Sequence, residues 1–265
     1  MRDIKNGIYI LPSLFTCGNM AFGFLSILAS INGAFTKAAW LLILAIACDI
    51  LDGRIARMTK TTSKFGVELD SLSDLVSFGV APAILMYQLV LNTMGKTGIA
   101  IAVLFVLSSA LRLAKFNVKT DEGKTSDFFM GLPTPASAGL IISFVLSYEL
   151  FILGPGEGLS FKTIPLLMKT MPTFFKMMPL IMILLTFLMV SNVPYSAFKN
   201  FRLSKPKAFQ FLVLIIVFLV VVFTYPQNTF FIIFALYALS GIVLYFTRYW
   251  KVIKRFYKHK EGSNE

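Results

Sequence analysis

The sequence predicts an all-α, polytopic membrane protein: a helical bundle with about eight transmembrane helices. The chain is 57% hydrophobic and its mean hydropathy is +0.76. Only 14% of its residues are charged, compared with roughly a quarter in soluble domains. Its apolar residues gather in stretches of roughly 20, the length at which a helix crosses a bilayer. A single integral membrane domain covering residues 1–265 is therefore expected.

Eight segments have the length and composition of a spanning helix. In chain order they are 10–31, 36–56, 67–93, 97–116, 132–153, 173–196, 207–225 and 228–247. The third is long, so its first turn is expected at the membrane surface. Pro172 and Lys176 interrupt the start of the sixth segment, so the helix is expected to be least regular there. Residues 248–265 are expected to form a basic tail whose helical part lies among the lipid headgroups.

The basic residues predict the orientation of these segments. With eight spans, 20 of the 25 Lys and Arg residues fall on the side that carries both termini. Because basic residues favour the inner side, both termini are expected in the cytoplasm, with the chain in the cytoplasmic membrane. The net charge of +12 does not indicate a nucleic-acid partner, since the basic residues flank apolar segments and suit anionic membrane lipid.

Four aspartates stand at the cytoplasmic ends of the second and third segments: Asp49, Asp52, Asp70 and Asp74. Spacings of three and four residues place each pair on one helix face, so the pairs face each other across a hairpin. Carboxylates this close to apolar surroundings need a neutralising partner, and hard divalent cations prefer oxygen ligands. The pattern predicts a metal site for two ions, Mg or Mn, suited to phosphate chemistry.

Two glycines and an arginine accompany the aspartates. Gly53 and Gly66 leave space for a phosphate or nucleotide to approach the backbone, or for close helix packing. Arg57 lies one turn beyond Gly53, where its planar fork could contact a phosphate.

The full pattern is Asp49-x-x-Asp52-Gly53-x-x-Ala56-Arg57, eight residues, and Gly66-x-x-x-Asp70-x-x-x-Asp74. It resembles the signature of the CDP-alcohol phosphotransferase family, membrane enzymes that displace CMP from a CDP-linked substrate with an alcohol. The resemblance implies a six-helix catalytic core at about 9–196, with 207–247 as two additional transmembrane helices. It also implies that Asp49, Asp52, Asp70 and Asp74 bind metal and that Asp74 is the general base. The implied CDP-binding residues are Asp49, Asp52, Gly53, Ala56, Arg57, Gly66, Asp70 and Thr16.

Further blocks resemble the serine-using members of that family. They are 71–83, 112–117, 131–136, and 11–16 with Asn19. Ser13 stands where an Asn is usual, and Lys115 where an Arg is usual. The resemblance implies a transferase of phospholipid biosynthesis that moves a phosphatidyl group from CDP-diacylglycerol to L-serine by direct displacement. Arg112, Lys115 and Asn117 are the predicted serine-binding residues, because a carboxylate needs a cationic partner.

Two alternatives stay open from the sequence. The same chemistry could use another acceptor: glycerol-3-phosphate, inositol phosphate or choline. A transporter of ions or protons could also carry intramembrane aspartates, although it would place them near mid-membrane on several helices. The expected partners are CDP-diacylglycerol, L-serine, membrane lipid and a second copy of the chain in a homodimer.

Overall fold

The computed structural model describes residues 2–59, 63–121, 128–153, 165–196, 216, 220–222 and 224–261. The elements follow in the order α1 (Arg2–Ile31), α2 (Phe35–Thr59), α3 (Lys64–Asp74), η1 (Leu75–Val80), α4 (Ala81–Leu89), η2 (Leu91–Met94), α5 (Lys96–Asp121), β1 (Phe128–Met130), α6 (Thr134–Leu153), α7 (Pro165–Val190), β2 (Pro194–Ser196) and α9 (Pro226–Glu261). The predicted seventh span, 207–225, lies almost wholly outside these residues.

The all-α membrane architecture is confirmed. Among the described residues, five helical stretches are long and apolar enough to cross a membrane: Pro12–Ile31, Lys64–Leu89, Lys96–Val118, Thr170–Val190 and Pro226–Thr247. α2 also forms where a span is expected, but it carries Lys37, Asp49 and Asp52 and is more polar. The chain is thus an integral membrane protein.

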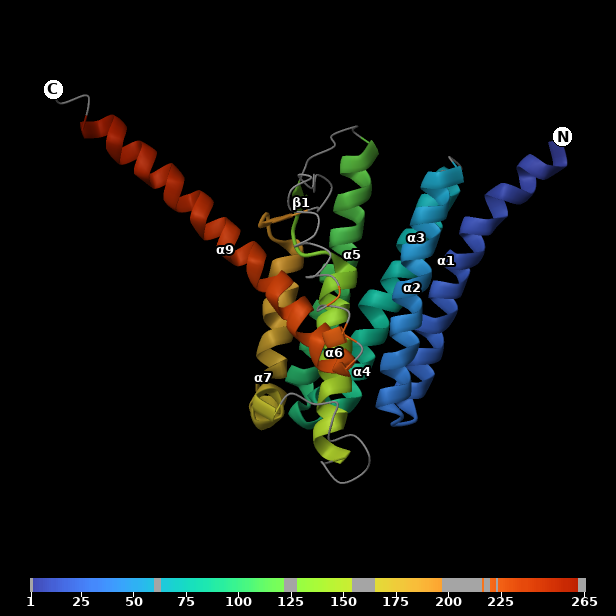
Figure 1. Cartoon of the computed structure of the whole chain (residues 1–265), viewed down its shortest axis with the longest axis horizontal. Coiled ribbons are helices and arrows are strands. Elements are labelled where there is room, and N and C mark those ends of the chain that lie inside the picture. The colour runs from blue at the N-terminus through green and yellow to red at the C-terminus, as the bar shows by residue number, and fades with distance from the viewer. Residues whose placement is uncertain are drawn as a thin grey trace.

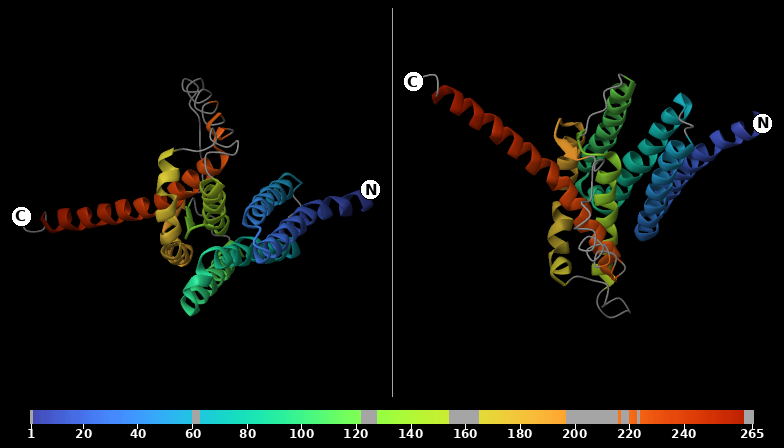
Figure 2. Two further views of the ribbon diagram at one scale, coloured as in Figure 1. Left: turned by 90° about the horizontal axis from the view of Figure 1, so that it is seen from below. Right: turned by 45° about the horizontal axis from the view of Figure 1, so that its top comes forward.

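The helices pack as neighbours in a way that gathers the aspartates at one end. α1 lies against α2 along its length and also contacts α3 and α4, while α6 packs on α9 and α5 on α7. Both ends of the chain lie at the same end of the bundle (Figure 1). The two views of Figure 2 keep α1 and α2 on one side of the molecule and α6, α7 and α9 on the other.

The third predicted span is less regular than a single helix from 67 to 93. α3 runs into the π-helical turn η1 and then α4, and the helix ends at Leu89, before the 3-10 turn η2. Pro82 stands in the first turn of α4 and has no N–H to donate to the turn before it. Widening that turn to π geometry accommodates the missing hydrogen bond, as is frequent near functional sites.

A short antiparallel strand pair, β1 with β2, brings the start of α6 next to the end of α7. Phe129 of β1 pairs with Tyr195 of β2. The sixth span was predicted to end at residue 196, but α7 stops at Val190 and the chain continues to β2, so the predicted span was too long at its C-terminal end. Gly131 follows β1 with a φ of +85°, and a Cβ there would collide with the carbonyl oxygen of Met189. Only glycine fits this crossing, which brings the start of α6 to the end of α7.

Candidate active site

The four aspartates meet between the end of α2 and α3, as the spacing predicts. Asp49 and Asp52 lie in the last turns of α2, and Asp70 and Asp74 lie on α3. Ser63 caps the start of α3, where its hydroxyl oxygen accepts a hydrogen bond from the Gly66 amide at 3.0 Å. This cap orients the first turn of α3 beside the end of α2.

Three of the carboxylates form one compact cluster. Asp49, Asp70 and Asp74 each offer a ligand oxygen, and these oxygens all lie within 4.8 Å of one another. Asp52 stands beside this cluster, within electrostatic range of the other three. Oδ2 of Asp52 and Oδ1 of Asp70 are buried and accept no hydrogen bond from the residues that the structure describes. Buried carboxylate oxygens without donors suit a hard divalent cation, so the residues present fit the predicted metal.

α1 holds Asp74 in place through side-chain and backbone hydrogen bonds. Asn19 donates from Nδ2 to Oδ1 of Asp74 at 3.3 Å. Ser73 and Ser77 flank Asp74 on its helix and donate to backbone carbonyls of α1, at Thr16 (3.0 Å) and Asn19 (2.9 Å). Sequence reasoning assigned no role to these serines, because only the packed helices show which backbone carbonyls they reach.

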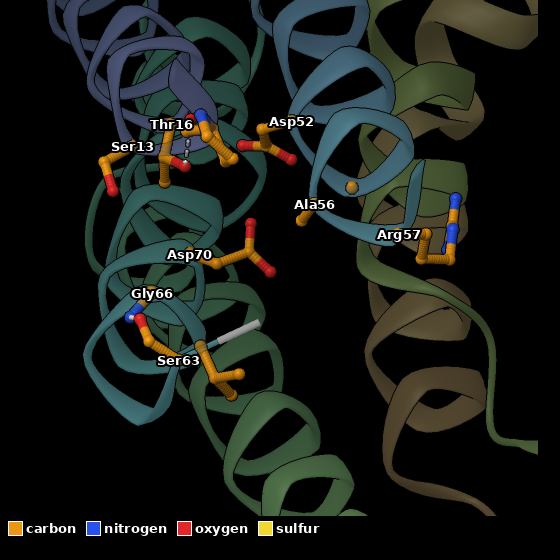
Figure 3. A pocket seen from close by; sticks show the side chains of 11 residues that line it. Ser13, Thr16, Asp52, Ala56, Arg57, Ser63, Gly66 and Asp70 are labelled. Atoms are coloured by element: carbon orange, nitrogen blue, oxygen red, sulfur yellow. Dashed lines mark hydrogen bonds between the residues drawn. The ribbon is translucent and has the colours of Figure 1, made fainter. Parts of the chain in front are cut away.

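An open pocket lies next to the cluster, between α1, α2 and α3 (Figure 3). Its lining residues are Pro12, Ser13, Thr16, Asp52, Gly53, Ala56, Arg57, Ser63, Gly66, Val67 and Asp70. These include every predicted CDP-binding residue except Asp49, which lies in the carboxylate cluster. Pro12, Ser13, Ser63 and Val67 were not predicted to bind CDP; the cap pattern Ser-x-x-Gly at 63–66 is a signal that could have indicated Ser63.

The two glycines leave the pocket open. A Cβ at Gly53 would have only Nη2 of Arg57 nearby, at 3.9 Å, and one at Gly66 would meet Oγ of Ser63 at 3.2 Å. In Figure 3, Asp52 from α2 and Asp70 from α3 point into the space between the two helices. The pocket thus has acidic groups on one side and exposed backbone at Gly53.

The three predicted acceptor residues on α5 do not converge on one point. Arg112 is buried, donates from Nη1 to the hydroxyl of Thr134 at 2.6 Å, and lies within electrostatic range of Asp74. Lys115 donates from Nζ to Oδ1 of Asn192 at 2.8 Å, and Asn117 donates to the hydroxyl of Ser71 at 2.9 Å. Arg112 interacts electrostatically with Asp74 of the carboxylate cluster, Asn117 ties α5 to α3, and Lys115 ties α5 to Asn192, which follows α7.

Comparison with known proteins agrees with this geometry. The family model described as CDP-alcohol phosphatidyltransferase matches residues 9–175. A Helicobacter pylori protein named CDP-diacylglycerol–serine O-phosphatidyltransferase is 36% identical over 97% of this chain and 99% of its own length.

Two further relatives match a shorter part of this chain. The archaetidylserine synthase of Methanothermobacter thermautotrophicus is 45% identical over 56% of this chain and 63% of its own length. A Bacillus subtilis protein named CDP-diacylglycerol–serine O-phosphatidyltransferase is 34% identical over 58% of this chain and 86% of its own. The aspartate motif, the pocket and these matches together show that the chain belongs to the CDP-alcohol phosphatidyltransferase family.

Proposed function

We propose that this protein is a CDP-diacylglycerol–serine O-phosphatidyltransferase, which transfers the phosphatidyl group of CDP-diacylglycerol to L-serine and releases CMP. The observation that carries the proposal is the electrostatic interaction of the buried Arg112 guanidinium with Asp74, a member of the carboxylate cluster. A cation for the serine carboxylate thus lies next to a group able to take the serine proton. The relatives that span nearly the whole chain carry the same name.

The carboxylates would hold divalent metal, with Asp49, Asp70 and Asp74 as the compact set and Asp52 completing it from the pocket side. Two ions, Mg or Mn, suit four carboxylates and a pyrophosphate. When bound, they neutralise negative charge on the phosphates of the donor substrate. Without them, four aspartates and a pyrophosphate would repel one another.

The pocket between α1, α2 and α3 would receive the CDP part of the donor. Gly53 lets the nucleotide approach the backbone of α2, and Arg57 at the pocket edge offers N–H donors to a phosphate. Thr16 lines the same pocket as Asp52, and its hydroxyl donates a hydrogen bond to the backbone carbonyl of Pro12 at 3.1 Å, which fixes its side chain at the pocket wall. Ala56 and Gly66 have small side chains or none, so they leave space for the ligand along the remaining walls of the pocket.

Serine would bind with its carboxylate on Arg112 and its hydroxyl toward Asp74. Asp74 takes the hydroxyl proton as the serine oxygen attacks the phosphatidyl phosphorus. A phosphorus–oxygen bond to serine forms, the bond to the CMP oxygen breaks, and CMP leaves. Asn19 holds Asp74 in the orientation required. Lys115 and Asn117 stay predicted serine-binding residues, but their present contacts favour Arg112 as the carboxylate partner.

The proposal includes an orientation and an assembly. The distribution of basic residues places both termini and the aspartates on the cytoplasmic side, where serine is available. The catalytic core is the six-helix unit at about 9–196 within a single membrane domain, and the chain acts as a homodimer. The family match over 9–175 supports the position of the core.

CMP release is the direct test of the proposed function. Purified protein in detergent is incubated with CDP-diacylglycerol, Mg or Mn, and one acceptor at a time: serine, glycerol-3-phosphate, inositol phosphate or choline. We expect serine alone to release CMP, and chelation of the metal to stop the release. An enzyme that ignores serine and consumes another of these acceptors would refute the serine assignment and leave the reaction class intact.

A further inference from the structure

Arg112 and Thr134 form a buried pair that leaves two hydrogen-bond donors unused. Nη1 of Arg112, on α5, donates to the hydroxyl oxygen of Thr134, at the start of α6, over 2.6 Å. Arg112 is 9% exposed and Thr134 is fully buried. Within the described part of the chain, Nε of Arg112 is buried with no hydrogen-bond partner. The oxygen of Thr134 is the acceptor in its bond, so the hydroxyl proton remains available, and no described residue accepts it.

The hydroxyl of Thr134 is not needed to start α6. A threonine at a helix start commonly accepts a hydrogen bond from an amide two or three residues further on. Here the amides of Ala136 and Ser137 donate instead to the carbonyl oxygen of Pro133, at 3.0 and 3.1 Å. The hydroxyl is therefore free of the local backbone and serves the contact to Arg112.

Backbone hydrogen bonds hold the segment that leads to Thr134. The amide of Gly131 donates to the carbonyl oxygen of Val193 at 2.9 Å. The amide of Leu132 donates to the carbonyl oxygen of Leu188, also at 2.9 Å. β1 pairs with β2 directly before this segment. Thr134 is thereby fixed relative to the end of α7.

Three helices meet one turn away from the pair. The hydroxyls of Ser109 on α5 and Ser137 on α6 lie 3.7 and 3.2 Å from Sδ of Met189 on α7. Ser109 is one turn before Arg112 and Ser137 is one turn after Thr134, so this junction holds α5 and α6 beside the pair. Donors that are fixed in advance bind a ligand with little further loss of side-chain freedom.

The two unused donors suit a carboxylate. An ionised carboxylate is acceptor-only and offers two oxygens. It also carries the negative charge that a buried guanidinium favours, and arginine recognises its planar shape. A neutral or cationic group in the same place would leave both donors buried and unpaired, which costs affinity.

We propose that Arg112 and Thr134 together bind the carboxylate of the acceptor, with Nε of Arg112 and the hydroxyl of Thr134 as donors to its oxygens. The inference rests on the proposed function and deepens it. It adds Thr134 to the acceptor site and assigns the start of α6 a part in selecting an amino acid as acceptor. An alcohol without a carboxylate, such as choline, leaves these two donors without a partner and is therefore disfavoured.

The first experiment removes the hydroxyl of Thr134 and then restores it. Thr134→Val keeps nearly the same shape without the hydroxyl, and Thr134→Ser keeps the hydroxyl. Initial rates of CMP release are measured against serine and against CDP-diacylglycerol. We expect Thr134→Val to raise the KM for serine at least about tenfold, with the KM for CDP-diacylglycerol unchanged. Thr134→Ser should stay within about threefold of the wild-type serine KM.

Thr186→Val is the matched control. It makes the same change at a half-buried threonine whose hydroxyl donates to the carbonyl oxygen of Met182 within α7. This hydroxyl has its partner inside its own helix and lies outside the proposed subsite. The variant should therefore keep the wild-type KM for both substrates.

The second experiment changes the substrate at the group that the subsite is proposed to bind. L-Serinamide keeps the hydroxyl and the amino group of serine and replaces the carboxylate by a neutral amide. Its Ki as a competitor of serine is measured in the wild type and in Thr134→Val. We expect Thr134→Val to change this Ki less than about twofold, while the serine KM rises at least about tenfold. If Thr134→Val does not fold, Thr134→Ala is measured in the same way.

The outcomes separate this inference from the proposed function. A wild-type protein that releases no CMP with serine contradicts the proposed function, and the inference fails with it. A serine-dependent wild type whose Thr134→Val variant keeps the wild-type serine KM overturns the inference alone. Equal weakening of serine and L-serinamide in that variant also overturns it, because Thr134 would then support the fold and not the carboxylate.

Discussion

Gly53→Ala should make the protein more stable and less active at the same time. Gly53 lies inside α2, directly after Asp52, and lines the pocket proposed for CDP. Within the described part of the chain, a Cβ at this position would have only Nη2 of Arg57 within 4 Å, at 3.9 Å. The added methyl group therefore enters open pocket space and displaces no protein atom.

The two effects can be estimated separately. Replacing glycine by alanine within a helix stabilises the folded state by about 0.5–1 kcal/mol, because the unfolded chain loses conformational freedom. A methyl group in a ligand pocket changes discrimination by about 1–3 kcal/mol, or about 10-fold to 200-fold. We therefore expect a higher unfolding temperature, a KM for CDP-diacylglycerol raised at least about tenfold, and an unchanged KM for serine.

Gly18→Ala is the matched control. Gly18 lies in α1 outside the pocket, and a Cβ there would make an ordinary contact of 3.5 Å with Sγ of Cys48. It should give a similar gain in stability with wild-type kinetics. The assays are thermal unfolding in detergent and initial rates against each substrate. A Gly53→Ala enzyme with wild-type KM for CDP-diacylglycerol would refute the placement of the donor nucleotide in this pocket.

Three further predictions follow from the site and the topology. Asp70→Asn should remove nearly all CMP release and the Mg- or Mn-dependent rise in unfolding temperature while the protein stays folded; substantial activity in this variant would contradict the metal assignment. Arg112→Gln should raise the serine KM by about tenfold to hundredfold, corresponding to roughly 1.5–3 kcal/mol, and Lys115→Gln should have a smaller effect; the reverse order would make Lys115 the carboxylate partner. In a cysteine-free background, Met58→Cys should react only with a thiol reagent added on the cytoplasmic side, and Met94→Cys only with one added outside. Labelling of Met58→Cys from outside would contradict the proposed orientation.

Much of the fold could be predicted because it depends on local patterns. Apolar runs of roughly 20 residues predicted the described helices close to their observed places, whereas the seventh predicted span lies almost wholly outside the described residues. The spacing of Asp49, Asp52, Asp70 and Asp74 predicted that they share one hairpin. Helix boundaries were less accurate. Pro82 changes a turn to π geometry, and Gly131 allows a strand crossing that ends α7 earlier than its composition predicts. The first is a local effect that hydropathy does not reveal, and the second depends on Met189, which a linear pattern does not place next to Gly131.

The sequence by itself determined the membrane class and the acidic motif, since composition and spacing within one hairpin carry them, and its resemblance to a known family implied nearly all the residues proposed for the CDP site. Only the tertiary structure decided which acceptor residue faces Asp74. Arg112, Lys115 and Asn117 are near neighbours in the chain, yet their partners are Thr134, Asn192 and Ser71. Such contacts depend on how helices and strands pack, and packing is a property of the whole folded chain.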